Sequence, residues 1–224
     1  MNILCIGKSS WSVSIPIDKF LEEGSNYTFN NSFGSGSGSG ASVAFLLAKW
    51  GVNAVVATMV GSDDYGTRIK KEFQELHAKT DYIETSYDKE TNMEISLINQ
   101  DSKVKTIMAI NHDNPMLKKY NYDFTPDIVY TDCFDYGASQ NAFSRYQNAK
   151  TIVGASTITP EVLEMCKYGK IIICNREFAE HISGIKTDVN NAQSLVDAYN
   201  KVQNKYPNAT IILSLDVNSS IALK

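Results

Sequence analysis

A run of alternating glycine and serine dominates the first quarter of the chain, in the segment SFGSGSGSGASVAFLLAKWG at residues 32–51. Apolar residues recur every three or four positions after the run, which predicts a helix over 41–50 that ends at Gly51. Alternating glycine and serine is typical of a flexible tether. A tether does not lead directly into a helix inside a domain, however. Three interpretations remain: a linker, a phosphate loop, or a surface on which a substrate lies.

The phosphate-loop interpretations fit poorly. A Walker-type loop ends in a lysine followed by serine or threonine, because the ammonium must reach the phosphates, but Ala41 and Ser42 follow the last glycine. The looser dinucleotide pattern fits Gly36 and Gly38, yet the next apolar run ends at 58–60 without an acid to hold a ribose. We therefore expect the glycines to let backbone N–H groups approach a ligand, with the helix N-terminus favouring oxygen-rich or anionic groups.

Composition points to one globular domain and excludes some partners. The chain has 224 residues, of which 43% are hydrophobic and 21% charged. A net charge of −4 and scattered lysines give no reason to expect nucleic acid. No segment resembles a signal sequence or a membrane span, so we expect a cytoplasmic protein without membrane contact. The cysteines lack metal-ligand spacing, which predicts reduced core thiols and no metal site: Cys5, Cys133, Cys166 and Cys174.

Apolar runs alternate with helical patterns along most of the chain, which predicts a doubly wound, mostly parallel α/β sheet. The expected buried strands are 2–6, 54–60, 127–131, 151–154, 171–174 and 210–215. The expected later helices are 137–147, one opening at 159–161, a short one ending at 183–184, and 189–205. Segments 11–33 and 92–110 instead alternate apolar with polar residues, which is typical of strands with one wet face. We expect them to form a small β-sheet lid, with strands at 11–15, 26–33, 92–98 and 104–110.

Three segments carry a resemblance to a known family. The stretch GSGSGASVAFLLAKWGVNAVVATMVGSDDYGTRIKKEF resembles the first signature region of the ribokinase-like (PfkB) carbohydrate kinases. NREFAEHISG is similar to that family's Asn-x-x-Glu-Ala-Glu-x-x-x-Gly segment, and IILSLDVNSSIAL to its Val-Thr-Leu-Gly-x-x-Gly-Ala segment. The likeness runs in register over the whole chain. It implies a ribokinase-like fold, a β lid that often forms a homodimer interface, and phosphorylation of a sugar hydroxyl by ATP with Mg²⁺.

The resemblance also implies site residues. The substrate-binding positions fall on Ser12, Gly36, Gly38 and Ser42, and the nucleotide or phosphate positions on Asn175, Ser214 and Asp216. Five positions depart from the family's residue types: Ser12 replaces an Asp, Ser37 a Gly, Ser42 an Asn, Phe178 a Glu and Asp216 a Gly. A carboxylate accepts two sugar hydroxyls whereas a serine offers one rotating hydroxyl, so these departures weaken the expected sugar contacts.

The catalytic base of the family is an Asp in a Gly-Ala-Gly-Asp motif, which we expect beyond residue 224. The chain as given is then an incomplete single domain, inactive as a kinase, whose parent phosphorylates a sugar. A noncatalytic binding or regulatory protein of the same fold is the alternative, and an α/β enzyme of another class is a third. Whether the reading frame continues into Gly-Ala-Gly-Asp separates the first two.

The remaining polar and aromatic candidates have simpler interpretations. Three histidines lack metal-ligand spacing and are expected at surface or helix-end positions: His77, His112 and His181. Asp63 and Asp64 precede a helical pattern and are expected to cap it. Trp11 and Phe33 lie in the predicted lid, where an aromatic ring either stacks on a sugar or packs in a dimer.

Overall fold

The chain is built from six helices and twelve strands in the described residues of a computed structural model, which are 1–118, 120–215 and 219–222. The helices are α1 (Ser39–Lys49), α2 (Asp64–Glu75), α3 (Tyr136–Arg145), α4 (Pro160–Met165), α5 (Arg176–Ser183) and α6 (Ala192–Lys205). None of these helices has the length and apolar character needed to cross a bilayer.

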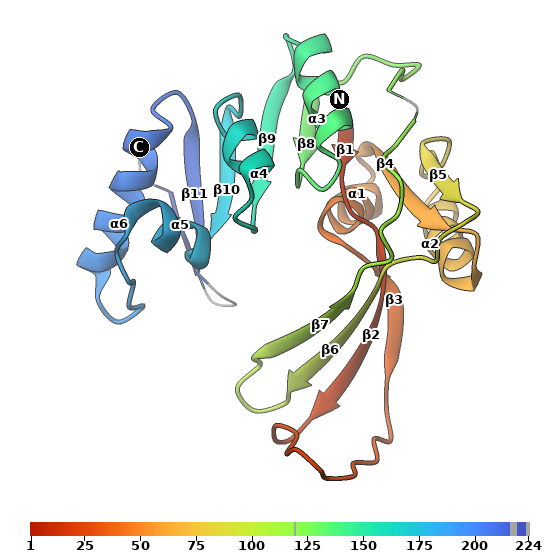
Figure 1. The fold of residues 1–224 in the computed structure, drawn as a ribbon. Coiled ribbons are helices and arrows are strands. Elements are labelled where there is room, and N and C mark those ends of the chain that lie inside the picture. The colour runs from red at the N-terminus through yellow and green to blue at the C-terminus, as the bar shows by residue number, and fades with distance from the viewer. Residues whose placement is uncertain (119, 216–218, 223–224) are drawn as a thin grey trace.

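Eight strands form the larger of two sheets (Figure 1). They are β1 (Asn2–Ile6), β4 (Asn53–Gly61), β5 (Ile83–Ser86), β8 (Ile128–Thr131), β9 (Lys150–Ala155), β10 (Ile171–Asn175), β11 (Thr210–Leu215) and β12 (Ser219–Ile221). Their order is β12-β11-β10-β9-β8-β1-β4-β5, and every strand is parallel to its neighbours except β12, which is antiparallel to β11. The predicted α/β fold class is confirmed.

The core lies on both faces of this sheet. Helices α1 and α2 pack against one face of β1 and β4, while α3 to α6 pack against the opposite face from β1 to β11. Strands β1 and β4 are covered on both sides, which explains their continuous apolar runs. Strands β9 to β11 are covered on one face, and their burial alternates along each strand. All four cysteines are buried and unpaired in this core. Burial, with a smaller contribution from Asp132, raises the pKa of Cys5 to about 12, so its thiol stays protonated.

Four strands form the smaller sheet, which projects from the core and which we call the lid (Figure 1). They are β2 (Ser10–Ile17), β3 (Phe33–Ser37), β6 (Met93–Asn99) and β7 (Lys105–Ile110), in the order β3-β2-β6-β7. Strands β2 and β6 are parallel, and the two outer pairs are antiparallel.

The third lid strand differs from the prediction. Residues 26–32 form no strand, and the first half of the glycine–serine run pairs with β2 instead, with Ser35 opposite Ser12. The Trp11 ring explains part of this choice, because a Cβ at Gly34 would lie 2.9 Å from that ring. The expected helix over 41–50 is confirmed but begins two residues earlier, at Ser39.

Trp11 meets neither of its two expected roles. Its side chain is buried in the core against α2, where it stacks on Tyr65 with ring centroids 5.6 Å apart. The guanidinium of Arg68 lies 5.7 Å from the Trp11 ring. Trp11 therefore anchors β2 to the core and cannot present its face to a sugar or a second subunit, whereas Phe33 is exposed.

Asp63 joins the start of α2 to the lid. Its carboxylate accepts a hydrogen bond from the backbone N–H of Gly66 at 2.8 Å, which confirms the predicted cap. The same carboxylate accepts bonds from the backbone N–H and the hydroxyl of Thr91, both at 2.7 Å, just before β6 begins. Burial by itself raises the pKa of Asp63, but the hydrogen bonds from Gly66 and Thr91 prevail and the pKa lies below its ordinary value.

We expect Asp63→Ala to lower the free energy of unfolding by about 1–3 kcal/mol, because it removes a helix cap and two further hydrogen bonds. The adjacent exposed Asp64 supplies the control, and Asp64→Ala is expected to change stability by less than about 0.5 kcal/mol. Urea unfolding of both variants measures the difference. The pKa of Asp63 is lower in the folded chain than its unfolded value of about 3.9, so the charge contributes fully above about pH 4 and is lost as the pH falls. Equal losses in the two variants would contradict this role.

Candidate functional site

A cavity of about 620 Å³ opens at the carboxyl ends of β1, β8 and β9. It is lined by Lys8, Ser39, Asn111, Met116, Asp132, Cys133, Phe134, Tyr136, Gly137, Ser156, Thr157, Thr159, Glu161 and Val162. Two cavities of about 660 and 690 Å³ lie at the opposite end of the sheet, near Thr151 and Asp127, where strands begin. Ligands of open parallel sheets bind at the carboxyl ends of the strands. The 620 Å³ cavity is therefore the candidate site.

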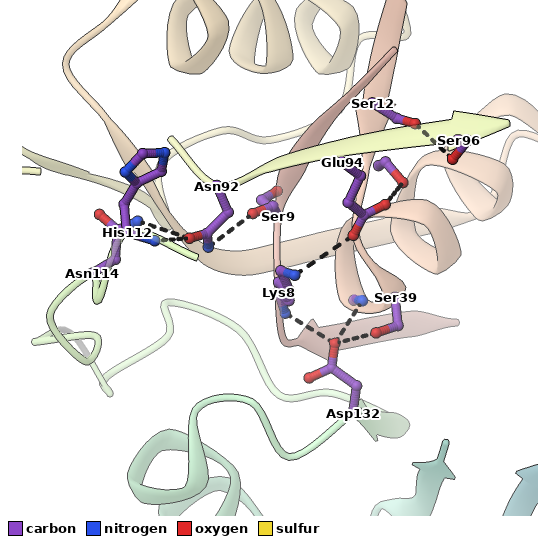
Figure 2. A network of polar contacts seen from close by, with 12 residues as sticks. Lys8, Ser9, Ser12, Ser39, Asn92, Glu94, Ser96, His112, Asn114 and Asp132 are labelled. Carbon is purple, nitrogen blue, oxygen red and sulfur yellow. Dashed lines mark hydrogen bonds and ion pairs between the residues drawn. The ribbon is translucent and has the colours of Figure 1, made fainter. Parts of the chain in front are cut away.

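Asp132 organises one wall of this cavity (Figure 2). It follows β8 directly and is buried. One carboxylate oxygen accepts bonds from the backbone N–H groups of Lys8 and Gly40, both at 2.9 Å, and from the Ser39 hydroxyl at 2.7 Å. The other accepts from the backbone N–H of Phe134 at 2.9 Å. The N-terminus of α1, which we expected to face an anionic group of a ligand, is thus occupied by a carboxylate of the chain itself.

The glycines of the run allow segments of the protein backbone to approach one another. A Cβ at Gly40 would lie 2.6 Å from the Cα of Gly7. Gly38 has a positive φ of 94°, and a Cβ there would lie 2.4 Å from the carbonyl oxygen of Lys8. The run therefore presses α1 against the turn that connects β1 with β2, and the linker interpretation is wrong.

Gly40→Ala is expected to cost about 3 kcal/mol or more of unfolding free energy, because two backbone segments must separate. Gly51 provides the comparison: its φ is 75°, but nothing lies within 4 Å of a Cβ there. Gly51→Ala should then cost only the left-handed conformation, about 1–2 kcal/mol. Chemical denaturation of the two variants tests the difference, and a larger loss for Gly51→Ala would contradict the close approach.

The expected substrate positions lie near the root of the lid, with one exception. Ser12 is buried in β2, and its hydroxyl lies 3.4 Å from that of Ser96. Gly36 lies beside β2 in β3, and its N–H donates to Glu72 at 2.9 Å, while Gly38 directly precedes α1. Ser42 lies within α1 and its side chain is exposed.

Three charged residues at the junction between the lid and the core were not predicted from the sequence: Lys8, Glu94 and Asp132. The Lys8 ammonium lies 3.6 Å from the Glu94 carboxylate, and their side chains are only 14% and 13% exposed. Glu94 also accepts a bond from the Ser37 hydroxyl at 3.0 Å. Figure 2 shows Lys8 between the carboxylates of Glu94 and Asp132. A signal for Asp132 was present, because it directly follows a buried strand, whereas nothing in the sequence joins Lys8 to Glu94.

Buried polar contacts extend this junction along the start of the lid. The Asn92 amide donates to the carbonyl oxygen of Ser9 at 3.4 Å and accepts from the backbone N–H of His112 at 3.0 Å. The His112 ring faces Glu90, with nitrogen and oxygen 3.9 Å apart. The side chain of Asn92 therefore ties both ends of the β6–β7 hairpin to the β1–β2 turn.

Two expected nucleotide positions meet at the ends of neighbouring strands. Asn175 and Ser214 are partners in the register of β10 and β11, while Asp216 lies outside the described residues. The Asn175 amide accepts from the backbone N–H of Phe178 at 2.9 Å and donates to the carbonyl oxygen of Ser156 at 3.1 Å, so it caps α5. Phe178 itself is buried in the core.

The comparisons with known proteins agree with this architecture. The sequence profile described as pfkB family carbohydrate kinase matches residues 1–224. The chain belongs to the pfkB family of carbohydrate kinases. A sequence comparison of this pfkB chain with curated proteins finds no significant match.

Solved structures similar to this pfkB family member include ribokinases and a fructokinase. Ribokinase from Giardia lamblia matches with a TM-score of 0.81 at 16% identity, over 100% of this chain and 72% of that chain. Arabidopsis thaliana ribokinase, complexed with ribose and ATP, matches with a TM-score of 0.75 at 15% identity, over 99% and 74% of the two chains. Fructokinase from Halothermothrix orenii matches with a TM-score of 0.77 at 13% identity, over 100% and 82%. At these identities the likeness establishes the fold.

Proposed function

We propose that this chain binds a sugar, or a sugar-like molecule, in the 620 Å³ cavity and forms the substrate side of an ATP-dependent sugar kinase. The cavity carries the proposal: it lies at the carboxyl ends of β1, β8 and β9, where Lys8 from the root of the lid and Asp132 from the core both line it. Its lining mixes hydroxyl, amide and charged groups with the rings of Phe134 and Tyr136. Sugars need both kinds of contact, since their hydroxyl edges bind polar groups and their C–H faces pack on aromatic rings.

ATP would contact the ends of β10 and β11, on the other side of the cavity from the lid. Asn175 and Ser214, the nucleotide positions that the family resemblance implies, are neighbours at these strand ends. The fit for Mg²⁺ is poor. Mg²⁺ in such sites is held by substrate phosphates with one or two carboxylates, and the buried Phe178 stands where the family has a glutamate tied to metal.

The described cavity residues bind rather than catalyse. Both oxygens of Asp132 are occupied by N–H or O–H donors of the protein. Glu161 accepts hydrogen bonds from its own backbone N–H and from the Thr159 hydroxyl, and these bonds hold the pKa of Glu161 below its ordinary value. Glu161 is therefore a weak proton acceptor. Neither carboxylate is poised to take a proton from a sugar hydroxyl. We propose that residues 1–224 bind sugar without transferring a phosphoryl group.

Calorimetry with D-ribose, D-fructose and adenosine is expected to detect binding of at least one of them. A coupled ADP-release assay with the same compounds, ATP and Mg²⁺ is expected to show no sugar-dependent turnover, because phosphoryl transfer relies on a positioned base and an anion-binding helix terminus. Turnover that a substitution within residues 1–224 abolishes would show that the chain contains the catalytic residue. Absence of binding by all three compounds would contradict the sugar site.

A noncatalytic binding or regulatory role is the second candidate. The Phe178 side chain favours it, because an apolar ring buried in the core cannot be exchanged for a metal-linked glutamate without repacking α5. The reading frame of the parent protein decides between the two, since only a kinase needs the Gly-Ala-Gly-Asp motif beyond residue 224. Either protein would act in the cytoplasm.

We further propose that the lid mediates homodimerisation. Strand β7 lies at one edge of the lid, and within the described residues no further strand pairs with its outer N–H and C=O groups (Figure 1). Apolar side chains are exposed along it: Ile107, Met108 and Ile110. A second copy of the same sheet would cover this apolar strand edge.

Sedimentation velocity is expected to show a dimer for the unmodified chain and a monomer for Ile107→Asp, because a buried charge in the interface is costly. Val189 is a matched control, since it is also 52% exposed but lies between α5 and α6. Val189→Asp should remain a dimer. A monomeric unmodified chain, or equal behaviour of the two variants, would overturn the lid interface.

A further inference from the structure

One face of the lid carries several polar side chains around Ser12, which stands where the family has an aspartate. Alternate residues of a strand share a face, so Ser10 and Ser12 lie on the same side of β2. The register places Ser37 of β3 opposite Ser10 and Glu94 of β6 opposite Ser12. Figure 2 shows Glu94 beside Ser12 and Ser96 and directed toward Lys8. The lid therefore presents a carboxylate one strand away from the position where the family has its aspartate.

The position of Glu94 suits a ligand-binding group. Its partner Lys8 lines the candidate cavity, and the Lys8 ammonium lies 5.9 Å from the centre of the Phe134 ring, which lines the same cavity. The Glu94 carboxylate is thus at the edge of the site. Two oxygens of a carboxylate offer about four acceptor positions, and Ser37 and Lys8 use only part of that capacity.

A second observation points to a missing polar partner. The Ser10 side chain is fully buried on this lid face, and its hydroxyl has no hydrogen-bond partner within the described part of the chain. A buried hydroxyl without a partner costs free energy. This unpaired hydroxyl lies on the same lid face as Glu94 but has no accessible surface, so it shows the polar character of that face and not a sugar contact.

We propose that Glu94 supplies the carboxylate that accepts sugar hydroxyls in this chain, in place of the aspartate that Ser12 lacks, and that Lys8 orients it. This inference rests on the proposed sugar site and identifies the residue that recognises the polyhydroxyl ligand. The Lys8 ammonium pairs with the Glu94 carboxylate and leaves some of its lone pairs for the ligand. A pair of charges that is nearly buried gains little stability by itself, which agrees with a role in binding.

Calorimetry with D-ribose, D-fructose and adenosine tests the assignment. Glu94→Gln keeps the shape but removes the charge, and it is expected to weaken binding of the sugar that the unmodified chain binds by about tenfold to hundredfold. Glu180 is the matched control, because its side chain is also 13% exposed and paired with a lysine, Lys186, but lies in α5. Glu180→Gln should change the affinity less than about twofold.

Monodeoxy derivatives of the same sugar separate binding from scaffolding. If Glu94 accepts one particular hydroxyl, the loss caused by Glu94→Gln is expected to disappear for the derivative that lacks this hydroxyl and to persist for the others. A purely structural role would weaken all derivatives equally, and that result would overturn the proposal. Glu94→Asp withdraws the carboxylate by one methylene and is expected to give the same pattern with a smaller loss, which keeps the test decisive if Glu94→Gln unfolds.

The double variant Ser12→Asp/Glu94→Gln adds a gain-of-function arm. It restores a carboxylate on the neighbouring strand, directly across the register, and is expected to recover part of the lost affinity. If Glu94→Gln leaves sugar binding unchanged, the role of Glu94 is wrong but the sugar site stands. Failure of the unmodified chain to bind any of the three compounds would instead overturn the sugar site together with this assignment.

Discussion

The Asp132 carboxylate is the contact on which the junction between core and lid depends. It binds the first turn of α1 through Ser39 and Gly40 and the β1–β2 turn through the N–H of Lys8. These segments carry the chain into and out of two lid strands, β2 and β3. A negative charge at a helix N-terminus is favourable because the unpaired N–H groups there carry partial positive charge. A single buried acid therefore stabilises α1 and fixes two connections to the lid.

A second acid holds the connection into β6. Asp63 binds Thr91 just before that strand begins. Gly61 permits this contact, because a Cβ there would lie 2.5 Å from the backbone nitrogen of Thr91. The lid is thus held by carboxylate–backbone hydrogen bonds at two places rather than by an apolar interface, apart from the Trp11 ring that packs against α2. Such an arrangement fixes the lid beside the candidate cavity, which Lys8 and Asn111 line next to its strands.

The predictable part of the fold is the part encoded by local patterns. Helices with clear caps and the apolar strands of the large sheet were found at nearly their observed positions, because each pattern acts within a few residues. Strand β3 was missed because its glycines and serines have low strand propensity, and only pairing with β2 makes it a strand. The short strand β5 was also missed, since it has four residues and pairs only at the edge of the sheet.

The candidate site was less predictable for a related reason. A motif assigns roles by position along one segment, and that approach located Ser12 but not the carboxylate beside it. Glu94 is 82 residues away in sequence and becomes a neighbour of Ser12 only through the parallel register of β2 and β6. In a sheet, the side chains across a register are about as close as those two residues apart on one strand. A carboxylate that is lost from one strand can therefore be replaced by one on the next strand. The residues at motif positions alone do not show whether a site still has its ligand-binding groups.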